Sequence, residues 1–216
     1  MFAFARPASL LYVLALGVGL ALAAHPVMAD PNEGDDDMEE LMTGLKPADP
    51  QPDAAALKPG LAVRYHMGRF NNLHEMMGIV GNAAGDKGKP LTTLDYQGPE
   101  GATVLTSPRR DMVGALIDGF IKFPQPGTYV LKVMSNDGIS IDIGGQNIFE
   151  DGRVHPTDYS WGLPVKIDTA GWYPIKVKYF QKKGGHALGL YWRAPNGDGK
   201  YVTVPAEMYA HLEKDE

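Results

Sequence analysis

The stretch Gly127–Asp151, GTYVLKVMSNDGISIDIGGQNIFED, carries the strongest pattern in the chain. Apolar side chains recur at every second position on both sides of a polar break, and a period of two places them on one face of a β-strand. They are Tyr129, Leu131 and Val133 before the break and Ile139, Ile141 and Ile143 after it. Ser140 and Asp142 fall on the opposite face, which we expect to meet water. Two half-buried strands are therefore predicted.

The polar break at residues 135–138, Ser-Asn-Asp-Gly, predicts a tight reversal between these strands. Asp-Gly supplies the positive φ angles that a two-residue hairpin loop needs. We expect a β-hairpin whose turn is polar, exposed and fixed by its own backbone. Asn, Asp and Gly are also what any hairpin turn favours, so a purely structural role for this turn stays open.

The remainder of residues 60–212 continues the strand pattern, with turn signals about every ten residues and no long helical periodicity. Trp172 and Trp192 are expected in the core because they lie within strands, and a short helix is expected at Phe70–Ile79. Residues 81–111 are predicted as long loops around a short strand at 91–96. Other strands are expected at 61–67, 116–123, 172–180, 188–192 and 202–204. The fold class is antiparallel all-β, a sandwich or barrel.

Composition and charge narrow the class of protein. The chain has 216 residues, no cysteine, and a formal charge of −6. This size suits one domain with appendages, and the acidic balance argues against nucleic-acid binding. Without cysteine no disulfide can cross-link the chain, so the stability of the fold must come from its core.

The N-terminus predicts export. Arg6 precedes the uncharged apolar run Leu10–Ala24, and Val27-Met28-Ala29 offers a signal-peptidase site. The run is shorter than the roughly 20 residues that span a bilayer, which favours cleavage over an uncleaved anchor. We expect a signal peptide at 1–29, a periplasmic or secreted protein, and no membrane span after cleavage.

Residues 30–59 are rich in Asp, Glu, Pro and Ala. Because they hold few large apolar side chains, we expect a disordered acidic linker before the domain at 60–212, and a short tail at 213–216.

Several short sequence motifs in the domain together resemble the anthrax protective-antigen domain, also called the PA-fourteen domain, over roughly residues 60–212. The motifs are Gly-Thr-Tyr at 127–129, Ser-Asn-Asp-Gly at 135–138, Ile-Asp-Ile-Gly-Gly at 141–145, Ala-Gly-Trp-Tyr-Pro-Ile at 170–175, Lys-Tyr-Phe at 178–180 and Leu-Tyr-Trp at 190–192. The resemblance implies a β-sandwich or barrel module of the kind found in adhesins, glycosidases and toxins, several of which bind carbohydrate.

No catalytic pattern emerges from the sequence. The chain has no cysteine nucleophile, and Ser140 lacks the second glycine of a nucleophile elbow. The histidines are scattered without the spacing of zinc ligands. We therefore predict a protein that is not an enzyme.

The resemblance implies a ligand site at the turn Asn136-Asp137 and a second loop, Gln181–His186. In calcium-dependent sugar binders of the family, two adjacent aspartates on this turn and carbonyl oxygens of the second loop hold the metal. Here Asn136 replaces one aspartate, so calcium would be held weakly, by Asn136, Asp137, Gln181 and carbonyls, at roughly 10⁻⁴–10⁻³ M or poorer. Alternatively, Lys182 or Lys183 places an ammonium where the metal would lie and pairs with Asp137.

Trp161 is the best candidate for stacking on a sugar ring, because it follows a polar loop rather than lying in a strand. The predicted ligand-binding residues are Asn136, Asp137, Trp161, Gln181, Lys182 and Lys183. The predicted function is recognition of a glycan. The alternative is a structural or protein-interaction part of the cell envelope that binds no sugar.

Overall fold

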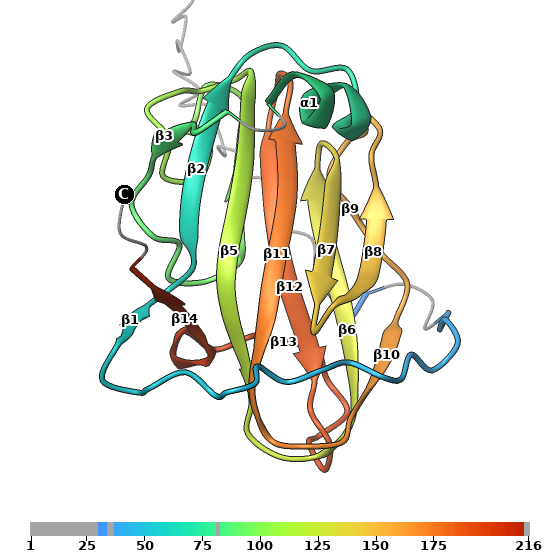
Figure 1. Cartoon of the computed structure of the whole chain (residues 1–216). Coiled ribbons are helices and arrows are strands. Elements are labelled where there is room, and N and C mark those ends of the chain that lie inside the picture. The colour runs from blue at the N-terminus through green and yellow to red at the C-terminus, as the bar shows by residue number, and fades with distance from the viewer. Residues whose placement is uncertain (1–29, 34–36, 81–82, 214–216) are drawn as a thin grey trace, which may run out of the picture.

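The alternating residues form two antiparallel β-sheets that pack face to face, which confirms the predicted fold class (Figure 1). The structure is a computed structural model and describes residues 30–33, 37–80 and 83–213. The predicted signal peptide lies outside the described residues. In the described part of the chain, no helix is long and apolar enough to cross a membrane.

The larger sheet is built around β5 (Val113–Phe123) and β11 (Gly171–Gln181), which pair from end to end. Its strand order is β1-β14-β5-β11-β7-β8, with β2 on β5 and β3 on β2. The other strands of this sheet are β1 (Leu57–Pro59), β2 (Ala62–Met67), β3 (Asp86–Lys87), β7 (Ile139–Ile143), β8 (Gln146–Asp151) and β14 (Tyr209–Leu212).

The smaller sheet is built around β6 (Gly127–Asn136) and β12 (His186–Arg193). Its order is β10-β6-β12-β13, with β9 on β6 and β4 on β12. The short strands are β4 (Asp95–Gly98), β9 (Asp158–Tyr159), β10 (Leu163–Ile167) and β13 (Val202–Thr203).

The core lies between the sheets and contains the apolar positions that alternation selects on β5, β6, β7, β11 and β12. Phe123, Tyr129, Tyr173 and Trp192 form an aromatic cluster in it, with ring centroids 4.9–6.0 Å apart. The prediction for Trp172 is wrong. Its register partner is Lys122, both side chains lie on the outer face, and the Lys122 ammonium sits 5.6 Å from the indole centroid.

The predicted hairpin is wrong in its pairing, although both strands exist. β6 pairs with β10, β12 and β9, whereas β7 pairs with β11 and β8, so the two strands belong to different sheets. The turn between them carries the chain from one sheet to the other. The turn is also not exposed, because Asp137 retains 2% of its accessible surface. Ser140 of β7, which was expected to meet water, is buried as well.

A short helix, α1 (Leu73–Val80), covers part of the outer face of the larger sheet (Figure 1). Asn72 caps it by accepting a hydrogen bond from the Glu75 N–H at 2.7 Å, and the Glu75 carboxylate accepts one from the Asn71 N–H at 3.1 Å. Its apolar face packs on Phe180. A 3₁₀ turn, η1 (Ala206–Met208), precedes β14. In the region predicted as loops, the strands are β3 and β4.

Residues 37–59 are not a disordered linker. Met38 and Met42 form parallel bridges to Gly162 and Val165 along β10, and the Lys46 and Ala48 amides donate to Gly144 and Trp172 carbonyls. Leu45 is 5% exposed and belongs to the main core. β1 then pairs with β14. This N-terminal arm, residues 37–59, crosses from the edge of one sheet to the edge of the other (Figure 1). Backbone pairing, which composition does not reveal, holds it in place.

Candidate functional site

The turn Asn136-Asp137 and the loop Gln181–His186 lie together, as predicted, but Asp137 faces the protein. One carboxylate oxygen accepts the Lys182 N–H at 2.7 Å, and the other accepts the His155 N–H at 3.2 Å. The Asp137 N–H donates to Phe180 O at 3.2 Å. Burial raises the pKa of Asp137, and the two backbone hydrogen bonds partly offset this. Asp137 therefore joins two loops to the end of β11.

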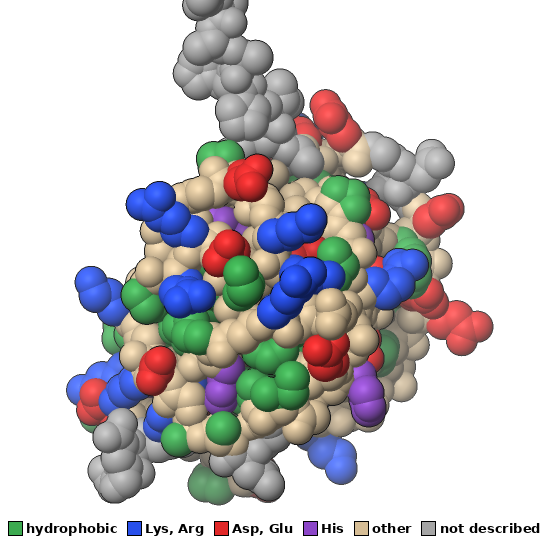
Figure 2. All heavy atoms as spheres, turned by 90° about the horizontal axis from the view of Figure 1, so that it is seen from above, with side chains coloured by type: hydrophobic (Ala, Val, Ile, Leu, Met, Phe, Trp, Pro, Cys, Tyr) green, Lys and Arg blue, Asp and Glu red, His purple; other side chains and the backbone are tan. Residues whose placement is uncertain are grey.

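The predicted lysine pairing takes a different form. Lys182 contacts Asp137 through its backbone N–H, and within the described residues no lysine ammonium forms an ion pair with that carboxylate. Lys183 is exposed. The end of the sandwich that carries α1 is seen from above in Figure 2, and Lys and Arg side chains are spread across it.

Amide side chains fill the space around the second loop. Gln181 is fully buried, and its Nε2 lies 3.3 and 3.4 Å from the carbonyl oxygens of Gly184 and Gly185. In the orientation that satisfies its neighbours, the Asn136 amide donates to Gly185 O and accepts from the Thr157 N–H and hydroxyl, each at 3.2 Å.

This donor set is a poor fit to calcium. Ca²⁺ takes six to eight oxygen ligands. The cluster offers one carboxylate, both of whose oxygens already accept N–H groups, and the two convergent carbonyls already face amide nitrogens. Within the described residues no three acidic, histidine or cysteine side chains gather as a metal site would need. Two buried side-chain atoms of this loop, Gln181 Oε1 and His186 Nδ1, have no hydrogen-bond partner among the described residues.

A groove opens beside this cluster, along the side of the sandwich where β8 of the larger sheet faces β9 and β10 of the smaller one. It consists of two adjoining hollows of about 470 and 510 Å³ that share Phe149, Glu150 and Trp161. We call it the Trp161 groove. The first hollow is also lined by Ser135, Asp151, Gly152, Arg153, His155, Asp158, Tyr159 and Ser160, and the second by Glu39–Met42, Asn147, Ile148 and Leu163–Val165.

Trp161 stands at the centre of the groove and is held on both sides by backbone contacts. The Ser160 hydroxyl accepts the Val133 N–H at 2.9 Å and donates to Trp161 O at 2.8 Å. The Gly162 N–H donates to Asp37 O at 2.8 Å, and Gly162 O accepts the Glu39 N–H at 2.9 Å. Trp161 still keeps 48% of its accessible surface, and its ring meets Phe149 edge-on at 6.1 Å. A large aromatic side chain exposed on a well-held backbone is typical of a contact surface.

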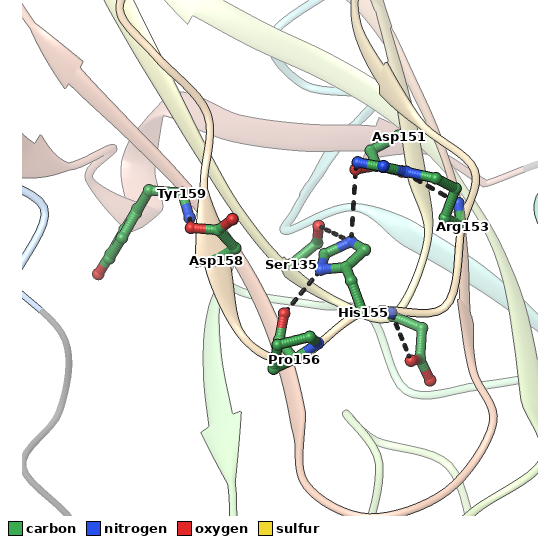
Figure 3. A network of polar contacts seen from close by, with 8 residues as sticks. Ser135, Asp151, Arg153, His155, Pro156, Asp158 and Tyr159 are labelled. Atoms are coloured by element: carbon green, nitrogen blue, oxygen red, sulfur yellow. Dashed lines mark hydrogen bonds and ion pairs between the residues drawn. The ribbon is translucent and has the colours of Figure 1, made fainter.

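Residues 151–158 form the polar wall of the first hollow (Figure 3). Arg153 binds Asp151 through two parallel contacts, Nε–Oδ1 at 2.9 Å and Nη2–Oδ2 at 2.7 Å. This pairing lowers the pKa of Asp151 to about 2. The hydrogen bond from the His155 N–H to Asp137 fixes the middle of this wall. Asp137 thus holds the polar wall of the groove in place through the backbone of His155.

The same wall holds a serine next to a histidine, but the arrangement is not a catalytic triad. His155 Nε2 lies 3.4 Å from the Ser135 hydroxyl, and Nδ1 lies 2.6 Å from Pro156 O (Figure 3). A triad places the carboxylate on the ring nitrogen that is remote from the serine. Here Asp151 approaches Nε2, the serine side, at 4.0 Å. Ser135 is buried, so the contact is better explained as a hydrogen bond that orients the ring.

Of the predicted site residues, the structure brings together Asn136, Asp137, Gln181 and Lys182, while Trp161 lies in the adjoining groove. The sequence analysis missed the rest of the groove, which four separate segments supply: the arm, Ser135 near the end of β6, β8, and the chain from Asp151 to β10. Trp161 next to a polar loop was the one local signal that pointed there.

Comparison with solved structures supports the same fold. The PA14 domain of the MpAFP antifreeze protein is 20% identical, with a TM-score of 0.60, covering 74% of this chain and 93% of its own. A PA14 sugar-binding domain from an RTX adhesin is 18% identical, with a TM-score of 0.55 over 71% and 98% of the two chains. The A domain of Epithelial Adhesin 9 from Candida glabrata, in complex with Galβ1-4GlcNAc, is 13% identical, with a TM-score of 0.57 over 80% and 97%.

Comparison with curated proteins gave no match. The family model of the PA14 domain, in contrast, matches residues 58–204, from β1 to the end of β13. This range covers most of both sheets, the turn at Asn136-Asp137 and most of the groove. The chain therefore belongs to the PA14 domain family.

Proposed function

We propose that this protein is an exported, non-catalytic glycan-recognition module, and that the Trp161 groove is its contact surface. The observation that carries the proposal is Trp161 itself, half exposed yet fixed on both sides by backbone hydrogen bonds. An indole carried on a backbone held in this way can stack on the apolar face of a pyranose with little ordering cost for the backbone. The sugar-binding RTX adhesin domain and the Epithelial Adhesin 9 complex support the ligand class.

In this proposal the turn Asn136-Asp137 and the loop Gln181–His186 are the framework of the site, and the sugar contacts lie beside them. Asp137 positions the wall at residues 151–158 through the His155 N–H, and it accepts the Lys182 N–H in the same way. Calcium is not required, because the Gln181 and Asn136 amides occupy the carbonyls that a cation would need. Weak calcium binding remains the competing prediction, and the two are separated by the calcium measurement in the Discussion.

A glycan array with the purified protein tests the proposal. Trp161→Ala is expected to lose the binding of every glycan that the unmodified protein captures. Trp172→Ala is the matched control, because that indole lies on the outer face of the larger sheet under Lys122. The absence of any bound glycan, or equal binding by both variants, would contradict the proposal.

The competing function is a protein-interaction module, and one observation favours it. Met38 and Leu41 of the arm are 53% and 49% exposed, and Leu41 lines the groove that Trp161 shares. Exposed apolar side chains close to an aromatic one also suit a protein partner. Capture of an envelope protein in stoichiometric amount, not displaced by any arrayed sugar and lost in Leu41→Ser, would favour this function over the first.

A further inference from the structure

The charges around the Trp161 groove are strongly unequal. The carboxylates that line its two hollows belong to Glu39, Glu40, Glu150, Asp151 and Asp158, whereas Arg153 is the one lysine or arginine there among the described residues. Its guanidinium is already paired with Asp151 through two contacts. The other base in the groove is His155, whose ring nitrogens contact Ser135, Pro156 and Asp151. In the described part of the chain, the groove therefore presents an acidic surface with no free lysine or arginine.

Four of the five carboxylates remain available to a ligand. Glu39, Glu40, Glu150 and Asp158 are exposed, and in the described part of the chain none of them forms an ion pair. They lie on both sides of the indole, because Asp158 belongs to the first hollow, Glu39 and Glu40 to the second, and Glu150 to both.

This arrangement discriminates between classes of glycan. An acidic sugar would place its carboxylate among like charges and be repelled. A neutral sugar would stack on Trp161 but gain nothing from the carboxylates. An ammonium group would be attracted both by the indole face and by the carboxylates around it.

We infer that the groove selects glycans carrying protonated amino groups, with the sugar ring on Trp161 and the ammonium groups among Glu39, Glu40, Glu150 and Asp158. The inference rests on the proposed function, since it names the ligand class of the same groove. Two features combine in such a ligand: an apolar ring face that suits the indole and a positive charge that suits its surroundings.

Isothermal titration with three soluble oligosaccharides tests the inference: a β-1,4-linked glucosamine oligomer, the same oligomer fully N-acetylated, and an oligomer of glucuronic acid. We expect the free-amine oligomer to bind at least about tenfold more tightly than the acetylated one, because the effects of several charge contacts, about two- to fivefold each, multiply. No binding of the uronate is expected. Binding of the amine should weaken as salt is raised.

Two variants locate the effect. Glu40→Gln/Glu150→Gln is expected to weaken the binding of the amine oligomer by about four- to twentyfold and to leave the acetylated oligomer unchanged. Glu207→Gln in η1 is the matched control, because this exposed carboxylate lies outside the groove. Trp161→Ala should abolish the binding of both oligomers.

The outcomes separate the two claims. Equal binding of the amine and acetylated oligomers, with both lost in Trp161→Ala, would overturn the charge selection and leave the proposed function standing. Preferred binding of the uronate would overturn it as well. Tighter binding of a lysine-rich peptide of equal charge would assign the groove to a protein partner and overturn the inference. No binding of any oligosaccharide would remove the proposed function together with the inference.

Discussion

Replacing Asp137 is the sharpest test of the structural role assigned to the turn. Its carboxylate accepts two N–H groups from different loops, His155 at 3.2 Å and Lys182 at 2.7 Å, and the residue is 2% exposed. In Asp137→Ala both donors lose their acceptor inside the protein. Each buried donor without a partner costs about 1–3 kcal/mol.

The two losses together predict a fall of about 2–6 kcal/mol in the free energy of unfolding, a large part of the roughly 5–15 kcal/mol typical of a domain. The substitution also removes the cost of burying a charged carboxylate, the same cost that raises the pKa of Asp137. We therefore expect a loss of stability at the lower end of this range. Asp137→Asn keeps one acceptor oxygen and should cost about half as much.

Urea unfolding at neutral pH measures these values. Asp168→Ala serves as control, because its carboxylate is exposed and, among residues 30–33, 37–80 and 83–213, forms an ion pair with the exposed Lys166 alone, at 3.2 Å, which predicts a change below about 0.5 kcal/mol. A loss below about 1 kcal/mol in Asp137→Ala would refute the reasoning, since a carboxylate that can be removed at so little cost is not a structural support.

Three further predictions test other parts of the structure. Asp151→Asn should lower the free energy of unfolding by about 1–2 kcal/mol at pH 7. Because Arg153 lowers the pKa of Asp151 from 3.8 to about 2, this contribution is present above pH 3.8 and is lost as the pH falls through 2. The urea midpoints of the variant and the parent should therefore converge near pH 2. Calcium at about 5 mM should leave the thermal midpoint where EDTA leaves it, whereas a site with a dissociation constant near 10⁻³ M would raise it by about 2–4 °C. Leu45→Ala should cost about 2–4 kcal/mol and Leu41→Ala almost nothing in the same urea assay, and equal small effects would contradict a docked arm.

The alternating pattern predicted which side chains form the core but not which strands pair. Ile139, Ile141 and Ile143 are buried as expected, because a period of two depends only on the local chain. The pairing of β7 with β11 depends on residues about 35 positions away. Ser-Asn-Asp-Gly suits any sharp reversal, so the turn residues alone cannot separate a hairpin from a crossing between sheets.

The arm and the groove escaped prediction for a related reason. Composition measures apolar burial, yet the arm is held mainly by backbone hydrogen bonds to sheet edges, by the Gln51 amide on the Trp172 backbone, and by the side chains of Leu45 and Met42. The groove combines four segments that meet only in the folded chain. Trp161 was identified because its polar neighbourhood gave it no reason to be buried, and it is exposed.

The binding of a captured glycan to the protein and to Trp161→Ala, measured side by side by calorimetry, tests the central claim most directly. If the Trp161 groove is the contact surface, truncation of an indole at its centre should weaken binding by at least about 2 kcal/mol, or roughly thirtyfold, with the thermal midpoint almost unchanged. Undiminished affinity in Trp161→Ala would place the ligand elsewhere on the sandwich and contradict the claim.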